Sequence, residues 1–181
     1  MRRLFSNFEA QAFHLPGGHN KVHVRIVEIP KMKAVYSGPL TTEARFEAFN
    51  KWFSEYHQTL KYELFPRDFM WYNERSGVQE WFYALPCDAA GVDCGGFEIR
   101  ELPHGLFAVA SCLDADLDQA QDWLKTREEL IQWVNQSDKF ALYENGDGKE
   151  ERYPMFHIVS PGKLISQGIS IENLYVPMIE K

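Results

Sequence analysis

The run Val24-Arg25-Ile26-Val27-Glu28-Ile29-Pro30 has a counterpart in the second half of the chain, Phe97-Glu98-Ile99-Arg100-Glu101-Leu102-Pro103. In both runs apolar and charged residues alternate, and both end on a glutamate, an apolar residue and a proline. This alternation is typical of a half-buried β-strand. Two strands with the same ending indicate an internal duplication of the chain.

The correspondence continues beyond the two prolines. Each half has a second β-prone run, then a helical stretch that carries a tryptophan before an apolar residue, and then a closing strand that reaches a proline. The paired segments are 33–37 and 106–110, Trp52-Phe53 and Trp133-Val134, and 81–86 and 174–177. We therefore expect each half to contain a strand, a turn, a second strand, a helix and two more strands.

Each of the two repeats is too long to be one unit of a solenoid, and two copies are too few to stack. The pattern therefore favours one pseudo-twofold α+β domain. We expect an N-terminal extension over residues 1–20 and a single domain over 21–181. Within it, the first repeat spans about residues 21–88 and the second about 96–181, joined by a Gly-rich connector. Two such copies commonly enclose a cleft along their shared axis.

Composition narrows the class of partner. Aromatic residues make up 14% of the 181 residues, including 5 Trp and 8 Tyr, more than core filling usually requires, which indicates a ring-lined pocket. A net charge of −7 makes nucleic acid an unfavourable direct ligand and favours a neutral or cationic one. No apolar run approaches the ~20 residues that span a bilayer, and the three cysteines lack metal-binding spacing, so we expect a cytoplasmic protein with reduced thiols, no metal and no cofactor.

Local signals place the main elements. Thr41 or Thr42 can cap a helix over 44–56, and Asp114 or Asp116 can cap a second helix that ends at Asn135. A strand over 139–143 and the turn Asn145-Gly146-Asp147-Gly148 predict a hairpin that returns through 151–157. In that returning strand Glu151, Tyr153 and Met155 would share one face.

These features together resemble the GyrI-like small-molecule-binding domain, which is the effector-binding domain of bacterial multidrug-responsive transcription activators. The resemblance covers nearly the whole chain from about Lys21. It rests on the doubled plan, the two Glu-apolar-Pro openings, the Trp-containing helices, the Glu151-x-Tyr153 pair and the closing Leu174-Tyr175-Val176-Pro177-Met178. It implies an antiparallel sheet with the helices on one side and an aromatic pocket between the repeats.

The resemblance also implies which residues bind a ligand. In that family a glutamate of the second repeat gives the pocket its negative charge, and Glu151 matches it, with Tyr153 as its aromatic neighbour and Glu144 as the competing acid. Trp81 and Tyr83 would face this pair from the first repeat, and Trp71 and Tyr143 complete the expected lining. The open alternative is that Glu151 is solvated at a hairpin and that the rings are ordinary core.

The sequence and the resemblance leave two candidate functions for the protein. The first is a stand-alone protein that senses or sequesters a lipophilic, cationic small molecule, since about twenty residues before the first strand are too few for a helix-turn-helix. The second, implied by the resemblance, is a hydrolase of cyclopropane-containing genotoxic compounds that uses Glu151 and Tyr153 in the same pocket. A protein partner, either a regulator or gyrase, is a third implied role for which the sequence shows no surface.

Overall fold

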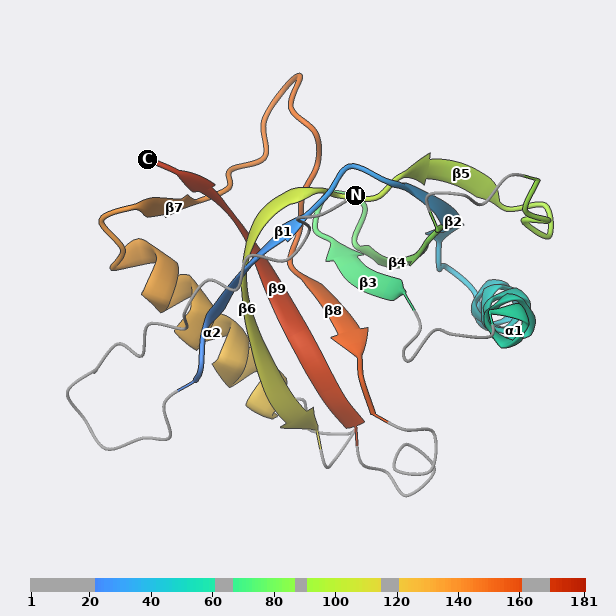
Figure 1. Ribbon diagram of the computed structural model, residues 1–181, viewed down its shortest axis with the longest axis horizontal. Coiled ribbons are helices and arrows are strands. Elements are labelled where there is room, and N and C mark those ends of the chain that lie inside the picture. Colours follow the sequence, from blue (N-terminus) through green and yellow to red (C-terminus); the bar gives the residue numbers. More distant parts are fainter. Residues whose placement is uncertain (1–21, 61–66, 87–90, 115–120, 161–169) are drawn as a thin grey trace, which may run out of the picture.

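The computed structural model describes residues 22–60, 67–86, 91–114, 121–160 and 170–181. Within them the chain is an α+β protein in which an antiparallel sheet curls between two helices (Figure 1). The first half contributes β1 (Arg25–Ile29), β2 (Lys33–Pro39), α1 (Glu43–Thr59), β3 (Asp68–Asn73) and β4 (Val78–Ala84). The second half contributes β5 (Glu98–Glu101), β6 (Gly105–Asp114), α2 (Gln121–Asn135), β7 (Phe140–Leu142), β8 (Met155–Ile158) and β9 (Ser170–Glu180).

The sheet runs in the order β1-β6-β9-β8-β3-β4-β2-β5, and β7 is added beside β9. The two halves meet at its centre, where Met70 of β3 pairs with Phe156 of β8 and Trp71 pairs with Met155. The short strands β1 and β5 each pair with a strand of the other half: β1 with β6, and β5 with β2. Central pairing and exchanged outer strands join the two halves into one sheet.

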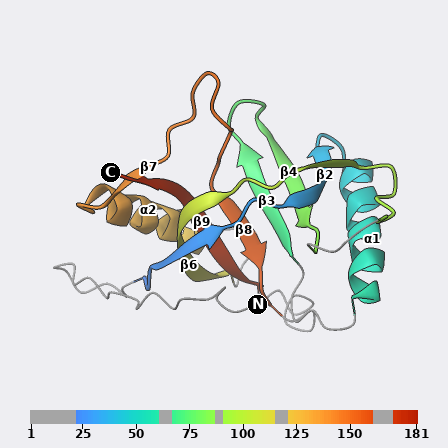
Figure 2. The same ribbon diagram turned by 45° about the horizontal axis from the view of Figure 1, so that its top comes forward.

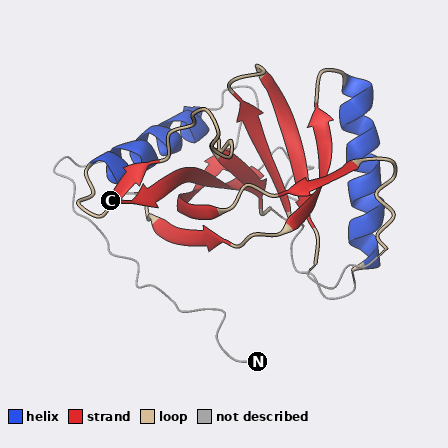
Figure 3. Cartoon of the chain, turned by 90° about the horizontal axis from the view of Figure 1, so that it is seen from above, coloured by secondary structure: helices blue, strands red, loops and turns tan. Residues whose placement is uncertain are grey.

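Both helices cover the same face of this sheet. On β4, Trp81 and Tyr83 point towards α1, and Val35 of β2 joins them around Phe49, which is fully buried. On β6 and β9, small and aliphatic side chains pack under α2 in a second, separate cluster. Strand pairing of Trp81 with Met70, and of Met70 with Phe156, puts these side chains on one face. Figures 2 and 3 show the two helices at opposite ends of the molecule, with the sheet between them.

The other face, which we call the inner face, carries one core cluster shared by both halves. It contains Tyr36, Trp71 and Phe82 from the first half, and Phe107, Tyr153 and Tyr175 from the second. Apolar side chains on each strand therefore alternate between a helix-covered face and the inner face, as a period of two requires.

Most of the expected local signals for α1 are confirmed. Thr42 is the N-cap, and its hydroxyl oxygen accepts a hydrogen bond from the Arg45 backbone N–H at 3.3 Å, which satisfies one of the free donors of the first turn. Helix α2 ends at Asn135 as expected. Of its two candidate caps, Asp116 lies outside the described residues. Cys94 is a free thiol, and no helix in the described ranges is long and apolar enough to cross a membrane.

The predicted hairpin after α2 is wrong. Strand β7 pairs with β9 instead of with the returning chain. The returning strand β8 begins at Met155, directly after Pro154, so Glu151 and Tyr153 precede the strand. Proline has no N–H to donate to a sheet, which explains why the strand begins only after it.

Candidate functional site

A pocket of about 280 Å³ opens on the inner face. Its aromatic walls are Tyr36 of β2, Trp71 of β3 and Phe82 of β4. Four acidic residues line it, Glu80, Glu101, Glu150 and Glu151, together with Asn73, Arg100 and Pro103. These side chains come from both halves of the chain, since β2, β3 and β4 belong to the first half and the remainder to the second.

Glu80 is the acid at the bottom of this pocket, and its residue is only 5% exposed. The indole N–H of Trp71 donates to its Oε2 atom at 2.8 Å, and the Asn73 amide donates to its Oε1 atom at 3.1 Å. Tyr36 also hydrogen-bonds to this carboxylate; burial, then the charge of Glu80 and this hydrogen bond, raise the pKa of Tyr36 to about 12. The carboxylate is thus held by neutral donors.

The acids at the pocket rim are each paired with a base. Arg75 contacts Glu151 at 2.9 Å, and Arg152 contacts Glu150 at 2.9 Å. Glu150 also lies 3.1 Å from the ring of His104, and Glu101 lies 3.0 Å from Lys31. Within the part of the chain that the structure describes, no such ion pair reaches Glu80.

This difference matters for a charged ligand. An acid already paired with a base offers little net attraction to a cation, and exposed pairs are weak and screened by salt. The charge of a buried carboxylate that has only neutral donors is not cancelled by a base, and it acts on a cation through a region of low dielectric. Of the four acids that line the pocket, Glu80 is therefore the one whose charge no ion pair among the described residues cancels.

The predicted residues Trp71 and Tyr153 lie together. Their ring centroids are 5.1 Å apart in an edge-to-face arrangement, and each residue is 5% exposed. Burial, and to a lesser degree the nearby charge of Glu151, raises the pKa of Tyr153. Glu151 itself lies at the rim with its side chain 36% exposed and bound to Arg75. The structure thus brings three of the predicted residues to one place, with Glu151 at its edge.

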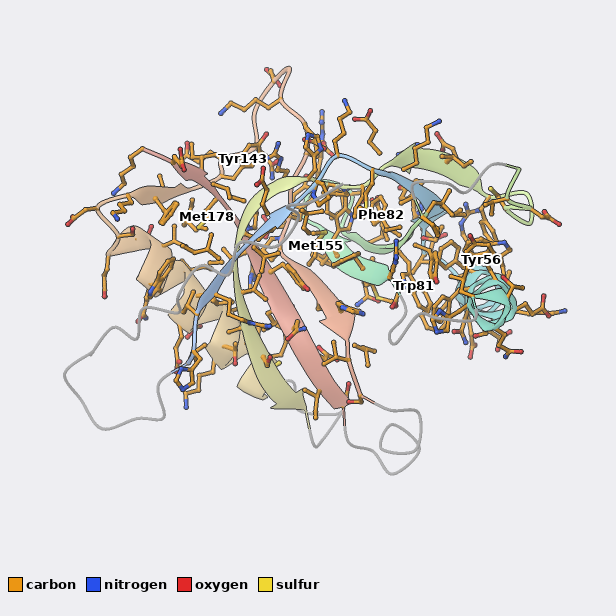
Figure 4. The ribbon with its side chains drawn as sticks, in the orientation of Figure 1. Tyr56, Trp81, Phe82, Tyr143, Met155 and Met178 are labelled. Carbon is orange, nitrogen blue, oxygen red and sulfur yellow. The ribbon has the colours of Figure 1, made fainter. Side chains whose placement is uncertain are left out.

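Trp81 and Tyr83 do not face this group. They lie on the helix-covered side of β4, where the Trp81 indole N–H donates to Asp68 at 3.0 Å and the Tyr83 hydroxyl lies 3.1 Å from His57 Nδ1. Figure 4 shows Trp81 directed towards α1 and Phe82 nearer the middle of the sheet. Residues 81 and 83 share a face, as expected, but the inner face belongs to Glu80 and Phe82.

Tyr143 contacts the segment that carries the rim acids and lies outside the pocket lining. Its hydroxyl donates to the backbone oxygen of Glu150 at 2.6 Å, and the guanidinium of Arg152 lies 4.6 Å from its ring centroid. Tyr143 therefore holds the segment that carries the rim acids, without itself lining the pocket. The competing acid Glu144 also lies outside the lining, and its backbone oxygen accepts from Lys149 at 3.2 Å.

A second pocket, of about 290 Å³, lies against α2 and is lined by Tyr72, Glu74, Trp123, Arg127 and Pro154. Its acid is neutralised, because Arg127 contacts Glu74 at 3.0 Å. This pocket has two aromatic walls but no unpaired charge of either sign among its lining acids and bases. The inner-face pocket is therefore the better candidate for recognising a charged ligand.

No model of a known protein family matches the sequence, and no curated protein does either. Among solved structures, a hydrolase from Listeria innocua is similar at a TM-score of 0.55 and 12% identity, over 89% of this chain and 94% of its own. An uncharacterized conserved protein from the same organism is similar at a TM-score of 0.56 and 10% identity, over 88% and 93%.

At this identity the two likenesses establish a shared fold alone. A structure of SAV2435 bound to tetraphenylphosphonium also matches, at 13% identity over 86% of this chain and 93% of its own. Its TM-score of 0.41 is too low to establish a common fold.

Proposed function

We propose that this protein binds a lipophilic, cationic small molecule in the inner-face pocket, with Glu80 as the charge that selects it. The observation that carries this proposal is the burial of the Glu80 carboxylate among Tyr36, Trp71 and Phe82 without an ion pair in the described residues. Such a carboxylate pays a desolvation cost that a ligand cation would offset. A neutral molecule of the same shape could not.

The aromatic walls add to the same preference. A cation over a tyrosine or tryptophan face gains roughly 0.5–2 kcal/mol per well-placed ring. Tyr36 and Trp71 both hydrogen-bond to Glu80 through their polar groups, so a cation over the face of either ring would also lie in the field of the carboxylate. In this proposal Tyr153 supports the Trp71 ring, and Glu151, which is already paired with Arg75, adds little attraction at the rim.

We also propose that the pocket lies between two copies of one ancestral unit. The strand order supports this, because it reads the same from either end when each strand of one half is matched with its counterpart in the other. The matches are β1 with β5, β2 with β6, β3 with β8 and β4 with β9. The extra strand β7 has no counterpart among the described residues of the first half. Superposition of the halves with Pro30 on Pro103 and Trp52 near Trp133 is the prediction that tests the duplication.

Fluorescence titration tests the binding proposal directly. The probes are a matched pair of aromatic dyes that differ only in a fixed positive charge, titrated against the wild-type protein at low and moderate salt. We expect saturable binding of the cationic dye and weaker binding of the neutral dye. Equal affinity for both dyes would contradict charge selection, and no binding of either would contradict the proposed function.

A second candidate function is hydrolysis, favoured by the similar fold of a Listeria innocua protein described as a hydrolase. In this chain the phenol of Tyr153 and the Glu151 carboxylate would polarise a strained substrate and water at the pocket rim. Incubation with a cyclopropane-containing alkylating compound, followed by mass spectrometry, distinguishes the two. Catalytic formation of a ring-opened product would favour the hydrolase, whereas its absence beside tight dye binding favours the binding protein.

A further inference from the structure

Arg100 lies where a ligand cation would go. Its guanidinium carbon is 4.2 Å from the centroid of the Tyr36 ring, which is the distance of a cation–π contact. Arg100 also contacts Glu98 at 3.0 Å. Among the described residues that line the inner-face pocket, Arg100 alone carries a positive charge.

Arg100 also lies in the electric field of Glu80. The pKa of Arg100 is raised, first by its hydrogen bond to Glu98 and then, against the opposing effect of burial, by nearby negative groups that include Glu80. The Tyr36 hydroxyl is bonded to Glu80 while the Tyr36 ring carries Arg100. Arg100 thus lies over the same ring, and in the field of the same carboxylate, that a ligand cation would use.

The position of Arg100 would also allow its side chain to move away from the Tyr36 ring when a ligand binds. It belongs to β5, the last strand of the sheet, whose residues are all exposed, and its side chain is 50% exposed. Glu98 lies on the same strand with its side chain 59% exposed, so it would remain a partner for the guanidinium outside the pocket. Moving one long side chain requires no change in the sheet.

From these contacts we infer that Arg100 is a built-in competitor that occupies the cation position of the empty pocket and sets the affinity threshold for cationic ligands. The inference rests on the proposed function, since it concerns the same pocket. A ligand cation has to displace the guanidinium from Tyr36, and weakly interacting cations fail to do so. A neutral ligand that displaces Arg100 gains less binding free energy, because it is not attracted by the charge of Glu80.

The test compares Arg100→Met, which removes the charge and keeps a long apolar side chain, with Arg100→Lys, which keeps the charge. Lys125→Met is the control for net charge, because Lys125 is an exposed residue of α2 outside the pocket lining. The matched cationic and neutral dyes are titrated against all four proteins. Far-UV circular dichroism and thermal unfolding establish that each variant is folded.

We expect Arg100→Met to bind the cationic dye about three- to tenfold more tightly than wild type, the factor that loss of one competing cation–π contact would give. Its affinity for the neutral dye should change less than about twofold, and Arg100→Lys and Lys125→Met should resemble wild type. Equal gains for both dyes would show that Arg100 is a steric cover, and an unchanged cation affinity in Arg100→Met would show no competition; either result overturns the inference. If no variant binds either dye, the proposed function fails instead.

Discussion

Replacement of Glu80 by Gln removes the charge proposed to select the ligand and keeps the shape of the side chain. In a site with an effective dielectric constant of about 20, a cation about 5 Å from the carboxylate is attracted by about 3 kcal/mol. Part of this is spent on removing the cation from water. We therefore expect a net loss of about 1–3 kcal/mol for a cationic dye, or roughly 5- to 150-fold in affinity.

The assay is the same matched titration, with the neutral dye as the internal control. Glu80→Gln also leaves one hydrogen bond unsatisfied, since the Gln amide nitrogen cannot accept from Trp71 or Asn73 as the carboxylate does. We expect that defect to cost about 1–3 kcal/mol of stability and to be visible in urea unfolding. It should affect both dyes equally, so the difference between the dyes isolates the charge.

Glu151→Gln is the matched control at the pocket rim. Because Arg75 already neutralises Glu151, this variant should weaken cation binding by less than Glu80→Gln does. Three results would refute the reasoning: equal losses for both dyes in Glu80→Gln, which indicate packing; no loss for either dye; or a larger loss of cation binding in Glu151→Gln. The last result would make Glu151 the selecting acid, as the family resemblance implies.

Three further predictions concern the structure around the pocket. Phe49 is fully buried against Trp81, so Phe49→Ala should lower the free energy of unfolding by about 3–5 kcal/mol, whereas Phe46→Ala, at a residue 38% exposed, should cost much less in the same urea melts. Because the pKa of Tyr36 is raised from 10.0 to about 12, its contribution to the free energy of unfolding is complete below pH 10 and is lost as the pH rises towards 12. The Tyr36→Phe variant should therefore lose less stability than the wild type over this pH range. An equal loss in both proteins would contradict this prediction. Trp71→Phe keeps a ring but removes a donor to the buried carboxylate, so it should cost about 1 kcal/mol of stability and reduce the quenching of tryptophan fluorescence by a bound dye.

The sequence was informative about strands because the two Glu-apolar-Pro runs carry a period-two pattern, and both runs lie at or beside outer strands, β1 and β5. The cap at Thr42 and the start of α1 also follow from local residues, since capping depends on neighbours three positions away. The helix continues to Thr59, three residues beyond its expected end at Tyr56. The pairing of β7 with β9 does not follow from local residues. It depends on contacts between segments far apart in the chain, which a turn signal at Asn145-Gly146 cannot reveal.

Only some of the residues expected to bind a ligand lie at the inner-face pocket, for a reason that lies in β4. The run Glu80-Trp81-Phe82-Tyr83 has large aromatic residues on both faces, so composition does not indicate which face is covered by a helix. A ligand-binding role was predicted for residues 81 and 83, yet residues 80 and 82 line the inner-face pocket. The available signal was Glu80 itself, an acid inside an otherwise aromatic strand, because such a residue is retained in a buried position only when it is hydrogen-bonded or used.

The most direct test of the central claim is a crystal structure of the protein with a lipophilic cationic dye. We predict that the dye's charged atom lies within about 6 Å of the Tyr36 ring centroid and of the Glu80 carboxylate, with the Arg100 guanidinium displaced from the Tyr36 ring and still paired with Glu98. Dye density in the other pocket, between Tyr72 and Trp123, with the inner-face pocket unchanged, would contradict the account.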